Sequence, residues 1–195
     1  MTPRKIEPSA IVPLPQYAGE RPGRRKRIAE LKKNRRLEVG PFATFYFESY
    51  DTMLHQVHEM LFIEKGGAEQ LPDELAAYNP LIPQGNELVA TVMFEIDDPL
   101  RRARVLANLG GVEHKAFLRI GTDMIRGVPE EDQERSREDG KASSVQFIRF
   151  PFTAAQIAAF RGGAGDVIIG FDHPNYGHMA VMPAAVRQAL AQDFA

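Results

Sequence analysis

The chain has 195 residues, of which 44% are hydrophobic and 26% are charged, and its formal net charge is −2. These values are typical of a globular protein with one sizeable core, and the near-neutral charge argues against a partner held by electrostatics alone. The absence of cysteine excludes disulfides, thiolate chemistry, iron–sulfur ligation and sulfur-ligated zinc. Any metal would need His, Asp or Glu ligands, which iron, manganese and zinc accept.

No apolar run reaches the length needed to cross a membrane, and the first residues lack the continuous apolar core of a signal peptide. We therefore expect a cytoplasmic protein with no membrane partner. Residues 1–195 are interpreted as a single domain. Its parts are an extended proline-containing arm (1–19), a helix-rich portion with one strand (20–86) and an α/β sandwich portion (87–195).

Four prolines within residues 1–19 indicate the extended arm, because proline cannot continue a helix or a central strand. A basic helix with a thin apolar stripe is expected next, from about Arg24 to Arg36. The aromatic segment FATFYFE then predicts a strand that ends at Glu48.

A helix capped by Asp51 or Thr52 should follow and run to about Lys65, where two glycines stop it. The segment AEQLPDELAAY predicts a short helix, and NPLIPQGN predicts a loop rich in turns.

The second half of the chain predicts strands and helices in the order β-α-β-β-α-β. The strands are ELVATVMFEI, VEHKAFLRIG, SVQFIRFPF and DVIIGFD, and a polar loop rich in both charge signs separates the second from the third. This order matches the ferredoxin-like pattern. A closing helix begins near Pro183. The predicted fold class is α+β, with a mostly antiparallel sheet and a helical N-terminal third.

The segment HQVHEMLFIEK, which begins at His55, resembles the start of a zinc-protease motif. That motif requires a second histidine four residues after His58, where this chain has Phe62, and the inverted motif fails as well. At about 100° per residue, both histidines point away from the apolar stripe of the helix and are expected to be exposed. Glu64, by contrast, lies in line with that stripe.

A carboxylate behind an apolar stripe must be paired, protonated or metal-bound, because burying an isolated charge is unfavourable. We expect Glu64, with Glu59 or Gln56, to line a polar pocket under the sheet. The alternative is that the helix frays and Glu64 reaches water. Glu48 and His173 could complete an iron, manganese or zinc site with only nitrogen and oxygen ligands. The alternative for His173 is a turn residue that is hydrogen-bonded or exposed.

Several stretches, among them QVHEMLFIEK, YNPLIPQGNELVATVMFEI and HPNY, resemble an uncharacterised bacterial family that is catalogued only as a domain of unknown function. The resemblance extends over nearly the whole chain. Its most distinctive parts are Q-x-x-E-M from Gln56 and Y-N-P-L-I-P from Tyr78. The family has no assigned activity, but its genes often lie beside those for rubrerythrin. The resemblance thus implies a small accessory protein linked to redox stress, which is an association and not a mechanism.

The basic run supports a different interpretation, a non-enzymatic module that docks a protein partner or, with weaker support, nucleic acid. Its candidate contacts are Arg24, Arg25, Lys32, Lys33, Arg35 and Arg36. The alternative is a solvated helix whose charge is offset by acidic neighbours, and no nucleic-acid-binding motif accompanies the run. Homodimerisation through a sheet edge or the arm is a further hypothesis. No set of residues in the sequence indicates a particular reaction, so the sequence favours a binding protein over an enzyme.

Overall fold

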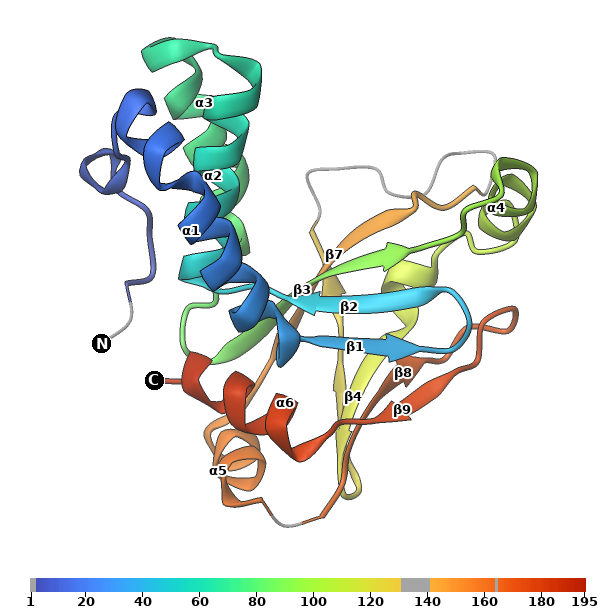
Figure 1. Ribbon diagram of the computed structural model, residues 1–195. Coiled ribbons are helices and arrows are strands. Elements are labelled where there is room, and N and C mark those ends of the chain that lie inside the picture. Colours follow the sequence, from blue (N-terminus) through green and yellow to red (C-terminus); the bar gives the residue numbers. More distant parts are fainter. Residues whose placement is uncertain (1–2, 131–140, 164) are drawn as a thin grey trace.

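The computed structural model describes residues 3–130, 141–163 and 165–195 (Figure 1). It has the predicted α+β class. The helices are α1 Leu14–Lys33, α2 Tyr50–Glu64, α3 Gly67–Tyr78, α4 Pro99–Leu106, α5 Ala154–Gly162 and α6 Ala184–Leu190. The 3-10 turns are η1 Pro8–Ala10, η2 Asn79–Leu81, η3 Val112–Lys115 and η4 Ala191–Asp193. Within the described ranges, no helix is long and apolar enough to cross a membrane.

Two antiparallel sheets form the body of the protein. The first has the order β1-β2-β3-β7-β6, and the second has the order β5-β4-β8-β9. The strands are β1 Arg36–Val39, β2 Ala43–Phe47, β3 Glu87–Phe94, β4 Ala116–Ile120, β5 Asp123–Arg126, β6 Val128–Pro129, β7 Val145–Pro151, β8 Val167–Phe171 and β9 Met179–Val181.

The chain passes from the second sheet to the first at Gly127, between β5 and β6. The Gly127 N–H donates to the Ala116 carbonyl oxygen at 2.9 Å, so the backbone stays close to β4 at this corner. A Cβ at this position would lie 2.6 Å from Ile148 Cγ2. Glycine therefore allows the two sheets to approach at the corner.

The main core lies between the sheets, because each contributes the inward face of an alternating strand pattern. Phe45, Phe47, Phe150 and Phe171 are among its buried aromatics. Burying each such side chain stabilises the fold by roughly 1.5–3 kcal/mol.

A smaller core forms between α2 and the outer face of the first sheet. Met53, Val57 and Leu61 of α2 pack there with Leu81 and Val89. Figure 1 shows α1, α2 and α3 stacked together beyond one end of this sheet. The smaller core thus fixes the helical layer against β3.

The ferredoxin-like order is not confirmed. The predicted first and third strands, β3 and β7, are antiparallel neighbours in one sheet, whereas β4 and β8 pair in the other. The reason is that the predicted polar loop contains β5 and β6, which carry the chain across to the first sheet. β9, in the segment after β8, was also not predicted.

The N-terminal third differs from expectation as well. α1 begins at Leu14 rather than near Arg24, and the part of the arm before it contains the 3-10 turn η1, so the expected extended arm is largely replaced by helix and turn. Pro13 lies at the N-cap and Pro15 in the first turn, where a missing N–H costs little. Arg36, expected at the end of the helix, instead begins β1, which pairs with β2 through a turn at Gly40 with φ +68°.

Candidate ligand-binding site

A cavity of about 270 Å³ lies between α2 and the outer face of the first sheet. We call it the α2 cavity. Its lining residues are Lys32, Tyr46, Glu48, Met53, Gln56, Tyr78, Leu81, Thr91, Met93, Val145 and Phe147. Tyr46, Thr91 and Phe147 lie opposite one another on β2, β3 and β7 and form one row of the sheet wall.

Glu48 directly follows β2 and is buried, with 6% of its surface exposed. Thr91 Oγ1 donates to Glu48 Oε1 at 2.7 Å, and Thr52 Oγ1 donates to Glu48 Oε2 at 2.6 Å. Thr52 also forms the capping box at the start of α2 with Ser49. The helix start and the sheet together hold this carboxylate in a fixed orientation at the cavity wall.

Gln56 and Tyr78 connect the two stretches that make the sequence distinctive. Their side chains are hydrogen-bonded to each other. Burial raises the pKa of Tyr78, and the bond to Gln56 acts in the opposite direction. Leu81 of the YNPLIP stretch lines the same cavity. Both distinctive stretches therefore meet at the α2 cavity.

Glu64 does not line this cavity. It is exposed, is the last residue of α2, and accepts a hydrogen bond from Gln70 Nε2 at 2.7 Å. The expectation that it lies on the buried face is wrong. The packed stripe ends one turn earlier, at Leu61, and Lys65 then leaves the helix with φ +57°.

Glu59 faces α1 rather than the cavity. Arg21 donates to both of its oxygens, at 2.9 and 2.8 Å, and the Tyr17 hydroxyl donates to Oε1 at 2.6 Å. The hydrogen bond from Arg21 lowers the pKa of Glu59 to about 2, against the opposite effect of burial. Burial and the bond to Glu59 raise the pKa of Tyr17. Glu59 therefore fastens α1 to α2.

The expectation that His58 is exposed is also wrong, since only 2% of its surface is accessible. Its ring stacks on Tyr17, with centroids 4.8 Å apart. Nδ1 lies 2.8 Å from the Leu54 carbonyl oxygen, and Nε2 lies 3.1 Å from the Val12 nitrogen. Because the Val12 N–H can only donate, Nε2 accepts and Nδ1 carries the proton. α1 covers this side of α2, and His55 is half-buried there.

His173 lies beyond β8 and is buried. Its Nε2 is 3.3 Å from the Gly110 carbonyl oxygen, and its Nδ1 accepts from the Asn175 N–H at 3.2 Å. It therefore packs on the loop after α4, and Figure 1 shows α4 far from α2. In the part of the chain that the structure describes, no group of three or more His, Asp or Glu side chains could hold a metal ion.

The basic candidates divide into two groups. Some have acidic partners, which are Arg24 with Glu20, Lys33 with Glu30, and the buried Arg35 with Asp193. Arg35 is thus unavailable to a partner. The others have no ion-pair partner among the described residues, and they are Arg25, Lys32 and Arg36.

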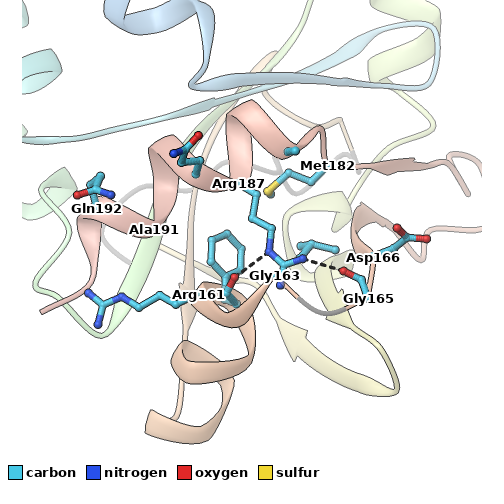
Figure 2. Close-up of a pocket in the computed structure, with 12 residues that line it drawn as sticks. Arg161, Gly163, Gly165, Asp166, Met182, Arg187, Ala191 and Gln192 are labelled. Atoms are coloured by element: carbon cyan, nitrogen blue, oxygen red, sulfur yellow. Dashed lines mark hydrogen bonds between the residues drawn. The ribbon is translucent and has the colours of Figure 1, made fainter.

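A larger hollow of about 730 Å³ lies between α5 and α6 (Figure 2). Figure 2 shows the guanidinium of Arg187 inside it, directed at main-chain oxygens. Arg187 donates to three such oxygens at and after the end of α5, at distances of 2.7 to 2.8 Å. Arg161 donates to the main-chain oxygens of Phe194 and Ala195. Arg187 thus binds the C-terminal end of α5, and Arg161 binds the last two residues of the chain. Both arginines therefore have a structural role.

The fold and the site define an α+β protein with two antiparallel sheets and a carboxylate-bearing cavity under its helical layer. The family profile of DUF3501, described as a protein of unknown function, matches residues 5–194. The chain therefore belongs to the DUF3501 family, and the resemblance seen in the sequence is confirmed.

A solved structure supports the same fold. The crystal structure of a protein of unknown function from Burkholderia pseudomallei K96243 is similar to this chain, with 34% sequence identity and a TM-score of 0.90. The match covers 98% of this chain and 100% of that chain. No curated protein matches the chain.

Proposed function

We propose that this protein binds a small organic molecule in the α2 cavity. The observation that carries the proposal is Glu48, a buried carboxylate that two threonine hydroxyls orient on a largely apolar wall. Ligand sites commonly combine an apolar lining with a few fixed polar groups. A volume of about 270 Å³ equals roughly nine water molecules at about 30 Å³ each, which suits a compact metabolite.

The site keeps part of the set predicted from the sequence, because Glu48 and Gln56 both line the cavity. The lining of the cavity does not favour the metal ion that the sequence suggested. Glu48 is the single carboxylate among the described lining residues, and no histidine accompanies it. One carboxylate and a carboxamide suit an organic ligand better than iron, manganese or zinc.

Benzyl alcohol is a suitable first probe, because it is neutral, aromatic and small. Ligand-observed NMR with the full chain should detect saturation transfer to the probe. Val145 is half-buried and lines the α2 cavity from the sheet. Val145→Phe should therefore abolish the transfer, because the larger ring fills the cavity. Val128→Phe adds the same ring on β6 of the same sheet, at an exposed position that does not line the cavity, and should preserve it. Equal signals from both variants would count against the site.

A second candidate is the docking of an acidic protein segment on α1. It is favoured by Arg25, Lys26 and Arg27, which are exposed and have no acidic partner among the residues described. Fluorescence anisotropy with a labelled polyglutamate peptide tests it. Binding should weaken steeply with salt and should be lost when these three residues are replaced by glutamine. Salt-independent binding, or no binding, would remove this candidate.

A further inference from the structure

Lys32 differs from the cations around it. It lies in the last turn of α1, is half-buried and lines the α2 cavity. Its neighbour Lys33 is paired with Glu30, at 2.7 Å. Within the described ranges, the Lys32 ammonium has no hydrogen-bond or ion-pair partner. The cavity wall therefore carries an uncommitted positive charge.

Glu48 presents the complementary feature. A carboxylate offers about four acceptor positions, and the two threonine hydroxyls occupy only one on each oxygen. The nearby Arg35 donates to the main-chain oxygen of Glu48 and to Asp193, not to the Glu48 side chain. In the part of the chain that is described, no lysine or arginine forms an ion pair with this carboxylate.

The two opposite charges line one cavity without pairing. The Lys32 ammonium nitrogen and the Glu48 carboxylate oxygens are more than 4.0 Å apart, which is too far for an ion pair. They also come from separate elements, the end of α1 and the segment that starts α2. Resting on the proposed function, we infer that the α2 cavity selects a small zwitterion with an apolar body. Its ammonium binds Glu48 and its carboxylate binds Lys32.

The rest of the lining matches the apolar body. Met53, Met93 and Phe147 provide flexible and aromatic apolar surface in the same cavity. The ring faces of Tyr46 and Tyr78 also suit an ammonium group, because an aromatic face attracts a cation. A free amino acid with an apolar side chain has this combination of groups and is small enough for the cavity.

Two other carboxylates near the site are already engaged. Glu95 accepts from Thr44 Oγ1 at 2.7 Å and from the Tyr46 hydroxyl at 2.9 Å, and Glu59 is bound by Arg21. These groups do not compete with Glu48 for the ammonium. Among the described residues that line the cavity, Glu48 and Lys32 are the two that carry a charge.

The test compares four probes of one aromatic size by isothermal titration calorimetry with the full chain. They are L-phenylalanine, phenethylamine, hydrocinnamate and benzyl alcohol. L-Phenylalanine should bind at least about tenfold more tightly than either singly charged analogue, because each lost charge removes a charge-assisted hydrogen bond.

The variants assign each charge. Lys32→Met should make L-phenylalanine bind no better than phenethylamine, and Glu48→Gln should make it bind no better than hydrocinnamate. Lys33→Met, on the same turn but paired with Glu30, should leave all four affinities unchanged. Lys32 lies in the last turn of α1 and is only half-buried, so its variant gives an answer even if Glu48→Gln fails to fold.

The outcomes separate the two proposals. If benzyl alcohol binds and L-phenylalanine binds no more tightly than it, the cavity binds ligands but the zwitterion inference is wrong. If none of the four probes binds, the proposed function fails and the inference fails with it. If Lys32→Met does not reduce the preference for L-phenylalanine, the inference is overturned even where that preference exists.

Discussion

At His58, both ring nitrogens are committed to main-chain groups. Nε2 accepts from the Val12 N–H, and Nδ1 donates to the Leu54 carbonyl oxygen. Protonation would place a second donor against the Val12 N–H. Burial accordingly lowers the pKa of His58 below its usual 6.5. The histidine acts as a neutral fastener between the N-terminal arm and α2, which is why no metal chemistry is needed to explain it.

This arrangement predicts a pH dependence of stability. The free energy of unfolding should fall as the pH is lowered through 6.5, because the unfolded chain takes up the proton more readily than the buried ring. The loss should stop once the pH is below the lowered pKa of the folded state. His58→Gln should flatten this slope, as measured by urea unfolding across a pH series.

His55 provides the control for that measurement, because burial lowers its pKa as well and gives a slope of the same sign. His55→Gln should remove only the part of the pH dependence that comes from His55. If the slope in His58→Gln equals that of the unmodified chain, the assignment to His58 is wrong.

Glu59→Gln should destabilise the protein by roughly 1.5–3 kcal/mol near neutral pH, the usual contribution of hydrogen bonds to a charged group. The pKa of Glu59 is lowered from 4.5 to about 2 in the folded state. The difference from the unmodified chain should therefore be complete above pH 4.5 and should vanish as the pH falls towards 2.

Glu30→Gln is the matched control, because the Glu30–Lys33 pair is exposed and should contribute less than about 1 kcal/mol. Urea unfolding of both variants measures the comparison. A Glu59→Gln loss no larger than that of Glu30→Gln would show that Glu59 does not fasten α1.

At the scale of elements, α1 explains why His58 is buried and not exposed as expected. Its own apolar stripe is thin, and only Tyr17 and Ile28 are buried. Its position depends on the contacts of Arg21 and Tyr17 with Glu59 across to α2. Periodicity within one segment cannot reveal such partners, so the buried state of His58 could not be predicted from α2 alone.

The residues of the α2 cavity were only partly predictable, because they come from several elements. From the sequence, Gln56 is a candidate for the lining of a polar pocket and Glu48 is a candidate ligand of a metal site, and both line the α2 cavity. Thr91, a polar residue within the apolar strand ELVATVMF, was a usable signal that was missed. Lys32 is a sequence candidate for partner binding only, and Tyr78 only as part of a distinctive stretch, because their place in the cavity depends on how α1 and α3 pack against the sheet.

Pro22 allows a test of how α1 is held. It lies inside the helix, where proline removes a hydrogen bond and costs roughly 3 kcal/mol. Pro22→Ala should raise the free energy of unfolding by up to that amount, less about 0.4–1 kcal/mol for the freer unfolded chain. Pro15→Ala, in the first turn, should change little. Chemical denaturation measures both, and a destabilised Pro22→Ala would mean that the proline has a packing role.

At the scale of the whole molecule, the two ends of the chain are joined. Arg4 donates to the Pro83 and Asp193 main-chain oxygens, both at 2.8 Å. The Ala195 N–H donates to the Gly85 carbonyl oxygen at 2.8 Å. Figure 1 shows the two termini on the same side of the molecule, with the C-terminus beside α6. Hydrogen bonds therefore connect the predicted arm and sandwich portion to the loop before β3. These contacts join residues far apart in the sequence, so they could not be predicted from local patterns.

The buried pair of Arg35 and Asp193 is another of these connections. Arg35 also donates to the main-chain oxygens of Phe47 and Glu48, so the pair links the C-terminal end to the start of α2. Burial raises the pKa of Asp193, while Arg35 acts in the opposite direction. The attraction is thus partly offset by desolvation, and the pair contributes more to the geometry than to the net stability.

Asp193→Asn should nevertheless be strongly destabilising, by about 3–5 kcal/mol, because it leaves the Arg35 guanidinium buried without a counter-charge. Asp172→Asn removes an exposed pair with Arg126, at 3.5 Å, and should cost less than about 1 kcal/mol. Urea unfolding of the two variants compares a buried with an exposed pair in one chain.

The same variant tests the α2 cavity, because Arg35 also donates to the main-chain oxygen of Glu48, which lines that cavity. Asp193→Asn should therefore weaken benzyl alcohol binding at temperatures where the protein remains folded. Full binding by a folded Asp193→Asn protein would show that the cavity is organised by Thr52 and Thr91 alone.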